Sequence, residues 1–271
     1  MKVIITRETF MASPSRVYSV FLFVHRWLGL ITLGVVTLVC ATGAMLSFED
    51  EITEALHPHL FDVEVESARA PLEAMVQSAE LLAADARVSS LTVHSDPARS
   101  VELSLGRGDT VYANPYTGEV LGRRVYRETA FYTVFALHRW LLAGDVGKWI
   151  VGTSTLLFCI ILLTGLWVWV PSSWKRLRQR LTVRKRAGLR RFLYDLHVSL
   201  GIYVVVFLFP MAFTGLQWSF EWFSEGIVQV SGATTERPEP PAAPEHDAAS
   251  AASLDALLAA ATARFDDAPS V

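Results

Sequence analysis

Three long apolar stretches dominate the hydrophobic pattern of the chain, at about Phe21–Phe48, Trp149–Val170 and Val198–Phe220. Each approaches or exceeds the ~20 apolar residues that a helix needs to cross a bilayer. Arg26 is the only charged residue inside any of them. The pattern therefore predicts a polytopic α-helical membrane protein with three transmembrane helices.

Between the first two stretches, residues 71–122 have the pattern of a small α+β module. Apolar residues recur along one face of an expected helix, and alternating positions and turn residues then mark short strands. The expected elements are a helix at Leu72–Ala86 and strands at Ser89–His94, Val101–Leu105, Thr110–Ala113 and Glu119–Leu121. No catalytic set appears in this module, and His94 and Asp96 are interpreted as isolated surface residues.

The net charge is only −3, but the charge is strongly partitioned. Residues 174–191 hold nine of the 24 basic residues and no acid. A short basic loop between two spans is retained on the cytoplasmic side, so this composition predicts orientation and contact with the lipid bilayer rather than nucleic-acid binding. We therefore expect a cytoplasmic N-terminus and outer segments in the periplasm of a bacterium, which would make this an inner-membrane protein.

These patterns together predict the organisation of the whole chain. The expected segments are a cytoplasmic leader (1–20), a first span (21–48), a periplasmic region (49–126) with the α+β module at about 71–122, an interfacial helix and loop (127–148), a second span (149–170), a basic cytoplasmic loop (171–196), a third span (197–220) and an outer tail (221–271).

Two histidines occupy matching positions in the first and third spans. His25 and His197 are each followed by glycine after four residues, Gly29 and Gly201, and by a Thr-Gly pair that ends 18 residues later. Eighteen residues are about five helical turns and roughly 27 Å, so the histidine and the last glycine share one face across the membrane. Ionisable groups inside spans are costly and tend to be functional, so the repeat suggests paired axial ligands for a haem.

Several phrases resemble the PepSY-associated transmembrane family. The similar phrases are residues 24–30 (VHRWLGL), 111–120 (VYANPYTGEV), 137–141 (LHRWL), 147–152 (GKWIVG), 163–171 (LTGLWVWVP) and 194–197 (YDLH). The family includes bacterial inner-membrane proteins of iron uptake, among them ferric-siderophore reductases that bind haem. The resemblance implies a PepSY domain at 71–122 and a fourth span after a second outer domain. Here the tail passes a linker at Thr235–Ala249 and begins a similar helix at Ser253–Phe265, as if cut midway through the second unit and leaving a half-complete four-helix haem bundle.

The predicted cofactor is haem b, with its iron held by His25 and His197. His138, in a local His-Arg-Trp-Leu repeat, is the candidate ligand of a second outer haem whose other ligand is missing, and His57 and His59 are conceivable substitutes. Arg26 and Arg139 suit haem propionates or, equally, membrane-interface anchoring. Gly29 and Gly201 would leave room for the macrocycle or would serve helix packing alone.

Two functions stay open from the sequence. The first is electron transfer from an unknown cytoplasmic or quinol donor to a periplasmic ferric siderophore, an oxidoreductase role in iron uptake. The alternative is a non-enzymatic PepSY anchor that binds or restrains a periplasmic partner such as a peptidase. No G-x-G-x-x-G fingerprint supports dinucleotide binding, and the spans lack the buried acids and broken helices of a transporter site.

Overall fold

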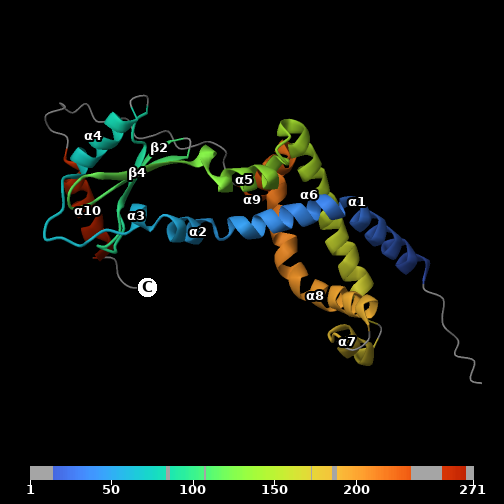
Figure 1. Ribbon diagram of the computed structural model, residues 1–271. Coiled ribbons are helices and arrows are strands. Elements are labelled where there is room, and N and C mark those ends of the chain that lie inside the picture. The colour runs from blue at the N-terminus through green and yellow to red at the C-terminus, as the bar shows by residue number, and fades with distance from the viewer. Residues whose placement is uncertain are drawn as a thin grey trace, which may run out of the picture. The chain divides into compact units, whose positions relative to one another are not determined.

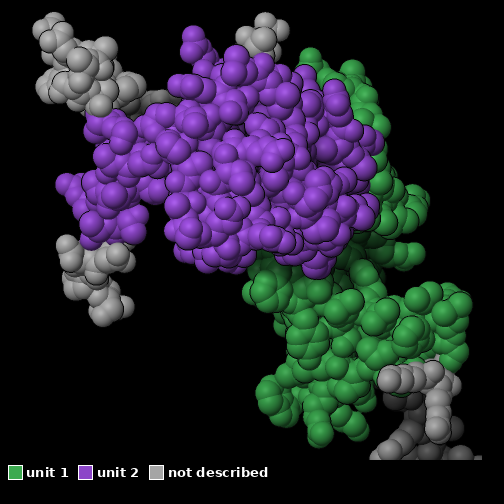
Figure 2. All heavy atoms as spheres, turned by 60° about the vertical axis from the view of Figure 1, so that its left-hand side comes forward, with its two compact units in different colours: residues 1–41, 137–235 green, residues 42–136, 236–271 purple. Residues whose placement is uncertain are grey.

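The computed structural model describes residues 15–83, 86–106, 108–171, 173–184, 188–232 and 252–266. The chain forms two compact units, which Figure 2 colours separately. Unit 1 comprises residues 1–41 and 137–235, and unit 2 comprises residues 42–136 and 236–271. Residues 1–14 of the predicted leader and the whole predicted linker at Thr235–Ala249 lie outside the described residues.

Three helices carry the apolar stretches, namely α1 (Arg16–Leu46), α6 (Gly144–Trp169) and α8 (Leu189–Gly215, continued by a 3₁₀ turn to Trp218). All three are long and apolar enough to cross a membrane. Shorter helices accompany them: α5 (Ala130–Trp140), α7 (Trp174–Arg180) and α9 (Glu221–Ser231). The predicted fold class, a polytopic α-helical membrane protein with a small α+β module, is confirmed.

The helix ends differ from the expected span limits. α8 begins at Leu189 rather than His197, so part of the predicted basic loop is helical. Asp195 explains this extension, because its buried carboxylate pairs with Arg191 at 2.7 Å, one turn earlier, and with Arg184 at 3.6 Å. Charges of opposite sign four residues apart stabilise a helix. Helices α1 and α6 likewise begin five residues before the expected limits, at Arg16 and Gly144.

Helices α6 and α8 pack against each other in unit 1. The indole nitrogen of Trp169 donates a 2.8 Å hydrogen bond to the Val198 carbonyl. Further along the same pair, Cys159 of α6 is buried in a cluster with Leu216 and Phe220. Most other large apolar side chains of the spans are exposed on the protein, as expected for helices whose outer faces contact lipid.

Unit 2 contains a four-stranded antiparallel sheet in the order β1-β2-β3-β4, covered by helix α4 (Figure 1). The strands are β1 (Ser90–Thr92), β2 (Val101–Gly106), β3 (Asp109–Ala113) and β4 (Val120–Val125), and α4 spans Leu72–Leu82. The helices α2 (Glu49–Leu56) and α3 (Pro58–Phe61) precede them, and a 3₁₀ turn at Tyr126–Glu128 follows. The order of one helix and four short strands agrees with the sequence pattern.

The core of unit 2 follows from the alternation of β2. Val101, Leu103 and Leu105 are buried, and the residues between them are only partly buried. Since side chains alternate between the faces of a strand, the three apolar residues meet α4 on one side. Met75 of α4 is fully buried against them. On the other face, Leu60, Phe61 and Tyr112 form a second small cluster.

The last described helix, α10 (Leu254–Asp266), pairs with α4 in unit 2 through reciprocal contacts at their N-termini. The Leu72 amide donates to the Asp255 carboxylate at 3.3 Å, and the Leu254 amide donates to the Glu73 carboxylate. Carboxylates at helix N-termini satisfy amides that lack an intrahelical partner. The two helices predicted to be equivalent therefore cap each other in the same way.

Candidate functional site

His25 lies on the part of α1 that belongs to unit 1, and its ring contacts α6. Its Nδ1 atom is 3.0 Å from the Ile161 carbonyl oxygen and 3.4 Å from the Thr164 hydroxyl. A carbonyl oxygen can only accept a hydrogen bond, so Nδ1 must carry the ring proton. The other ring nitrogen, Nε2, then has a free lone pair, which is the form of histidine that ligates metals.

His197 lies on α8, and its ring faces that of His25. The two ring centroids are 6.1 Å apart, and the ring planes are inclined by 55°. The structure thus brings together two predicted ligands that are 172 positions apart in the chain and belong to different helices. His25 is half-buried and His197 is exposed on the protein.

The surroundings of the histidine pair include residues that the sequence reasoning missed. A Cβ atom added at Gly165 would lie 2.8 Å from the His25 ring, so a larger residue here would displace the ring from its observed position. Thr164, the preceding residue, is buried. Both residues are in a phrase used for the family resemblance, yet nothing in their spacing connects them with His25.

The two predicted glycines beside the pair have open surroundings. A Cβ atom added at Gly29 or at Gly201 would meet no atom within 4 Å. The glycines are therefore not required by tight helix packing in the described part of the chain. Arg26, the predicted propionate partner, is exposed next to His25.

His138, the predicted ligand of a second site, has a similar hydrogen bond. Its Nδ1 atom is 3.0 Å from the Val39 carbonyl oxygen on α1. Burial lowers the pKa of His138, which keeps the imidazole neutral at pH 7. Arg139, predicted to pair with a propionate or anchor the interface, lies 5.4 Å above the Trp218 ring, an aromatic contact that suits the interfacial role.

His57 and His59 flank Pro58 at the start of α3 in unit 2, with their rings 6.0 Å apart. Both are exposed. Their predicted role as substitute ligands for the second site stays a prediction. Among the described residues, no group of three or more His, Cys, Asp or Glu side chains could hold a metal ion.

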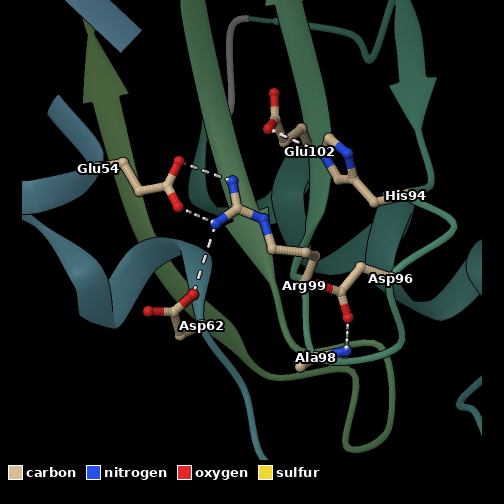
Figure 3. Close-up of polar contacts among 7 residues, drawn as sticks. All are labelled: Glu54, Asp62, His94, Asp96, Ala98, Arg99 and Glu102. Atoms are coloured by element: carbon tan, nitrogen blue, oxygen red, sulfur yellow. Dashed lines mark hydrogen bonds and ion pairs between the residues drawn. The ribbon is translucent and has the colours of Figure 1, made fainter. Parts of the chain in front are cut away.

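A polar cluster in unit 2 corrects one interpretation of the sequence. His94 is not isolated, because its Nε2 atom is 3.1 Å from the Glu102 carboxylate (Figure 3). Asp96 accepts a 2.9 Å hydrogen bond from the Ala98 amide. Beside them, Arg99 donates to both oxygens of Glu54, at 2.5 and 3.1 Å. The contacts tie α2 to the segment before β2, which is a structural role.

The Arg99–Glu54 pair predicts a pH dependence of unit 2. Hydrogen bonds from Arg99 hold the pKa of the Glu54 carboxyl below its usual value of 4.5. A depressed folded-state pKa means that the pair stabilises the fold above about pH 4.5 and that this contribution is lost as the pH falls through the folded-state pKa. Glu54→Gln should therefore increase amide exchange of β2 and β3 at pH 7, and by less at pH 3.

Hydrogen-exchange mass spectrometry of the full chain in detergent, with variant and wild type compared at each pH, measures this effect. The exposed Glu66 provides the matched control, and Glu66→Gln should leave exchange unchanged at both pH values. Equal protection of wild type and Glu54→Gln at pH 7 would show that the ion pair contributes nothing.

Comparison with known families adds one finding. Residues 22–270 match a family model described as PepSY-associated TM region. The match covers α6, α8, most of α1 and the sheet of unit 2. No curated protein matches the chain significantly.

Proposed function

The chain belongs to the PepSY-associated TM family, and from this premise we propose that it is a haem-binding electron-transfer protein of the bacterial cytoplasmic membrane. Its role would be the reduction of ferric siderophore iron on the outer side of that membrane during iron uptake. The observation that carries the proposal is the pair of imidazoles on α1 and α8, with one nitrogen of His25 left free for a metal.

The geometry of the pair suits a single iron between two histidines. Imidazole nitrogens lie about 2 Å from the metals they ligate, so two rings on opposite sides of one ion have centres about 6 Å apart. The observed separation is 6.1 Å. Within helical bundles, ligands from facing helices are the usual way to hold such a cofactor.

The other residues near the pair fit the same cofactor. Open space beside Gly29 and Gly201 is compatible with a flat macrocycle, and the exposed Arg26 guanidinium suits a propionate carboxylate. Haem, when bound, supplies one-electron redox chemistry, and the protein contributes its axial ligands, orientation and access. We assign His138 to a second, outer haem site.

The charge distribution supports an orientation for this route. The basic residues of α7 and the following segment would stay on the cytoplasmic side, which assigns the nearby His25–His197 pair to the donor side. His138, before α6, would then lie toward the periplasm. Electrons would pass from a cytoplasmic or quinol donor, through the inner pair, to a ferric siderophore outside.

Spectroscopy and rapid mixing test the proposal. Protein expressed with haem supply and purified in detergent is expected to show a Soret band and, after reduction, the sharp α-band of a six-coordinate haem. When reduced protein is mixed rapidly with a ferric siderophore, the haem absorbance should return to that of the oxidised form. Mixing with the iron-free siderophore should leave the haem reduced. Absence of haem, or reduced haem that ferric siderophores leave reduced, would overturn the proposal and favour a non-enzymatic anchor.

A further inference from the structure

The contact between His25 and α6 has three components on one helix face. The Ile161 carbonyl oxygen faces Nδ1 at 3.0 Å, and the Thr164 hydroxyl lies 3.4 Å from the same nitrogen. The His25 ring occupies the space that a Cβ atom at Gly165 would need. Residues three and four apart share a helix face, so a carbonyl, a threonine and a glycine at i, i+3 and i+4 form one dock for an imidazole.

The hydrogen-bond directions of this dock determine the tautomer of His25. The Thr164 hydroxyl proton is directed at carbonyl oxygens of its own helix, with Thr164 Oγ1 2.8 Å from Ile160 O and 3.0 Å from Ile161 O. Toward His25 the hydroxyl oxygen can therefore only accept, as the Ile161 carbonyl does. Both neighbours require the proton on Nδ1 and so leave Nε2 as the ligating atom.

The same spacing of a carbonyl, a threonine and a glycine recurs on α1, where His138 contacts that helix. His138 Nδ1 is 3.0 Å from the Val39 carbonyl oxygen. Thr42 and Gly43 follow Val39 by three and four residues, as Thr164 and Gly165 follow Ile161. His25 and His138 thus each lie beside a backbone carbonyl of another helix, and in both cases a Thr-Gly pair follows that carbonyl at three and four residues.

A third copy of this spacing, on α8, provides an internal comparison. Met211 is followed by Thr214 and Gly215, and the Thr214 hydroxyl is 2.8 Å from the Pro210 carbonyl and 3.3 Å from that of Met211. The local hydroxyl pattern therefore repeats that of Thr164. A Cβ atom added at Gly215 would meet nothing within 4 Å. The Thr-Gly pairs at 164–165 and 214–215 therefore have the same local hydrogen bonds, although only the first has a histidine ring beside its glycine.

From these contacts we propose that Thr164 and Gly165 are positioning residues for the ligand His25. Gly165 provides the space that the ring occupies, and the Ile161 carbonyl with the Thr164 hydroxyl holds the proton on Nδ1. The haem part of this inference rests on the function proposed above. The tautomer part concerns the protein without any cofactor and is tested separately.

Measurements of haem affinity test whether the space beside Gly165 is needed to position His25. Gly165→Val places a side chain where the His25 ring lies, and loss of such outer-shell support lowers metal affinity about 10–100-fold. Gly215→Val, the same change in the Thr-Gly pair with open surroundings, should keep the wild-type affinity. Thr164→Val should weaken haem binding by about 10-fold. Thr164→Ser should keep the wild-type affinity, because serine retains the hydroxyl.

Nitrogen-15 NMR of haem-free protein labelled at histidine tests the tautomer independently. The His25 signal, assigned from its absence in His25→Ala, is expected to show a protonated Nδ1 and an unprotonated Nε2. Thr164→Val should shift this signal toward a tautomer mixture. The signal also remains informative if Gly165→Val fails to fold.

The outcomes separate this inference from the proposed function. Wild-type protein that takes no haem overturns the function, while the Nδ1–H tautomer in the same sample would still support the dock. Wild-type protein that binds haem, together with unchanged affinity in Gly165→Val and Thr164→Val, overturns the positioning roles. A wild-type Nε2–H tautomer also overturns them.

Discussion

Replacing His197 with alanine is expected to lower haem retention more than about 100-fold, and His25→Ala is expected to do the same. Loss of one axial ligand should exceed the effect of changing an outer-shell partner, because it removes a direct bond to the iron. The two rings lie 6.1 Å apart on separate helices, so neither histidine can substitute for both positions. The measurement is the ratio of Soret to protein absorbance after purification with haem supply.

Free imidazole distinguishes a lost ligand from a damaged fold. Each alanine variant has space where a ring was, and added imidazole should partly restore the Soret band and a six-coordinate spectrum. A misfolded protein would not respond. Recovery in both variants, without any effect of imidazole on the wild type, would identify the two side chains as ligands.

His94 in unit 2 is the matched control for these substitutions. It is bonded to Glu102, in the part of the chain that forms the sheet module, and His94→Ala should keep the full haem content. Unchanged Soret bands in both His25→Ala and His197→Ala would contradict the ligand assignment outright. The single histidine substitutions thus carry the most direct test of the proposed cofactor.

Gly147→Ala is expected to have the second large effect, by disrupting the corner between α5 and α6. A Cβ atom at this position would lie 1.8 Å from the Trp140 carbonyl oxygen and 2.6 Å from its carbon. Both are backbone atoms, which cannot rotate away as a side chain can. A strain of about 3–5 kcal/mol and a fall in melting temperature of about 10 °C are therefore expected.

The corner cannot relax easily, because its backbone is already unusual. Leu141 and Leu142 have φ angles of 52° and 57°, in the left-handed region that residues other than glycine rarely adopt. Hydrogen bonds from Ala143 to Trp140 and from Gly147 to Ala143 hold the turn. Strained residues of this kind persist only where the surrounding structure determines them. The corner follows directly after His138, so its disruption should also displace that histidine.

Thiol labelling provides the melting curve for this variant. The chain has two cysteines, and in a Cys40→Ser background the buried Cys159 of α6 becomes accessible to a maleimide dye only as unit 1 unfolds. Gly34→Ala on α1 is the control, because a Cβ atom there would meet nothing within 4 Å. Equal melting of Gly147→Ala and Gly34→Ala would show that the corner tolerates a side chain.

The sequence pattern was sufficient for the elements and for the pairing of His25 with His197. Long apolar runs identified α1, α6 and α8, because a bilayer-spanning helix must be apolar over its whole length. Alternation and turn residues identified the strands of unit 2, such as β2 with buried Val101, Leu103 and Leu105. The matched spacing after His25 and His197 pointed to one site, and their rings do meet. Helix ends were less predictable, since Asp195 and its arginine partners extend α8 through residues expected in a loop.

By itself, then, the sequence determined which segments cross the membrane and which histidines form a pair, since both follow from periodicity along one helix. Only the tertiary structure decided which residues of another helix receive each ring. Ile161, Thr164 and Gly165 lie more than 130 positions from His25, and their spacing carries no trace of that contact. The sequence also suggested that His94 was isolated, whereas folding brings it to Glu102. Contacts between separate elements depend on how the helices and strands pack in three dimensions, and local patterns do not encode that packing.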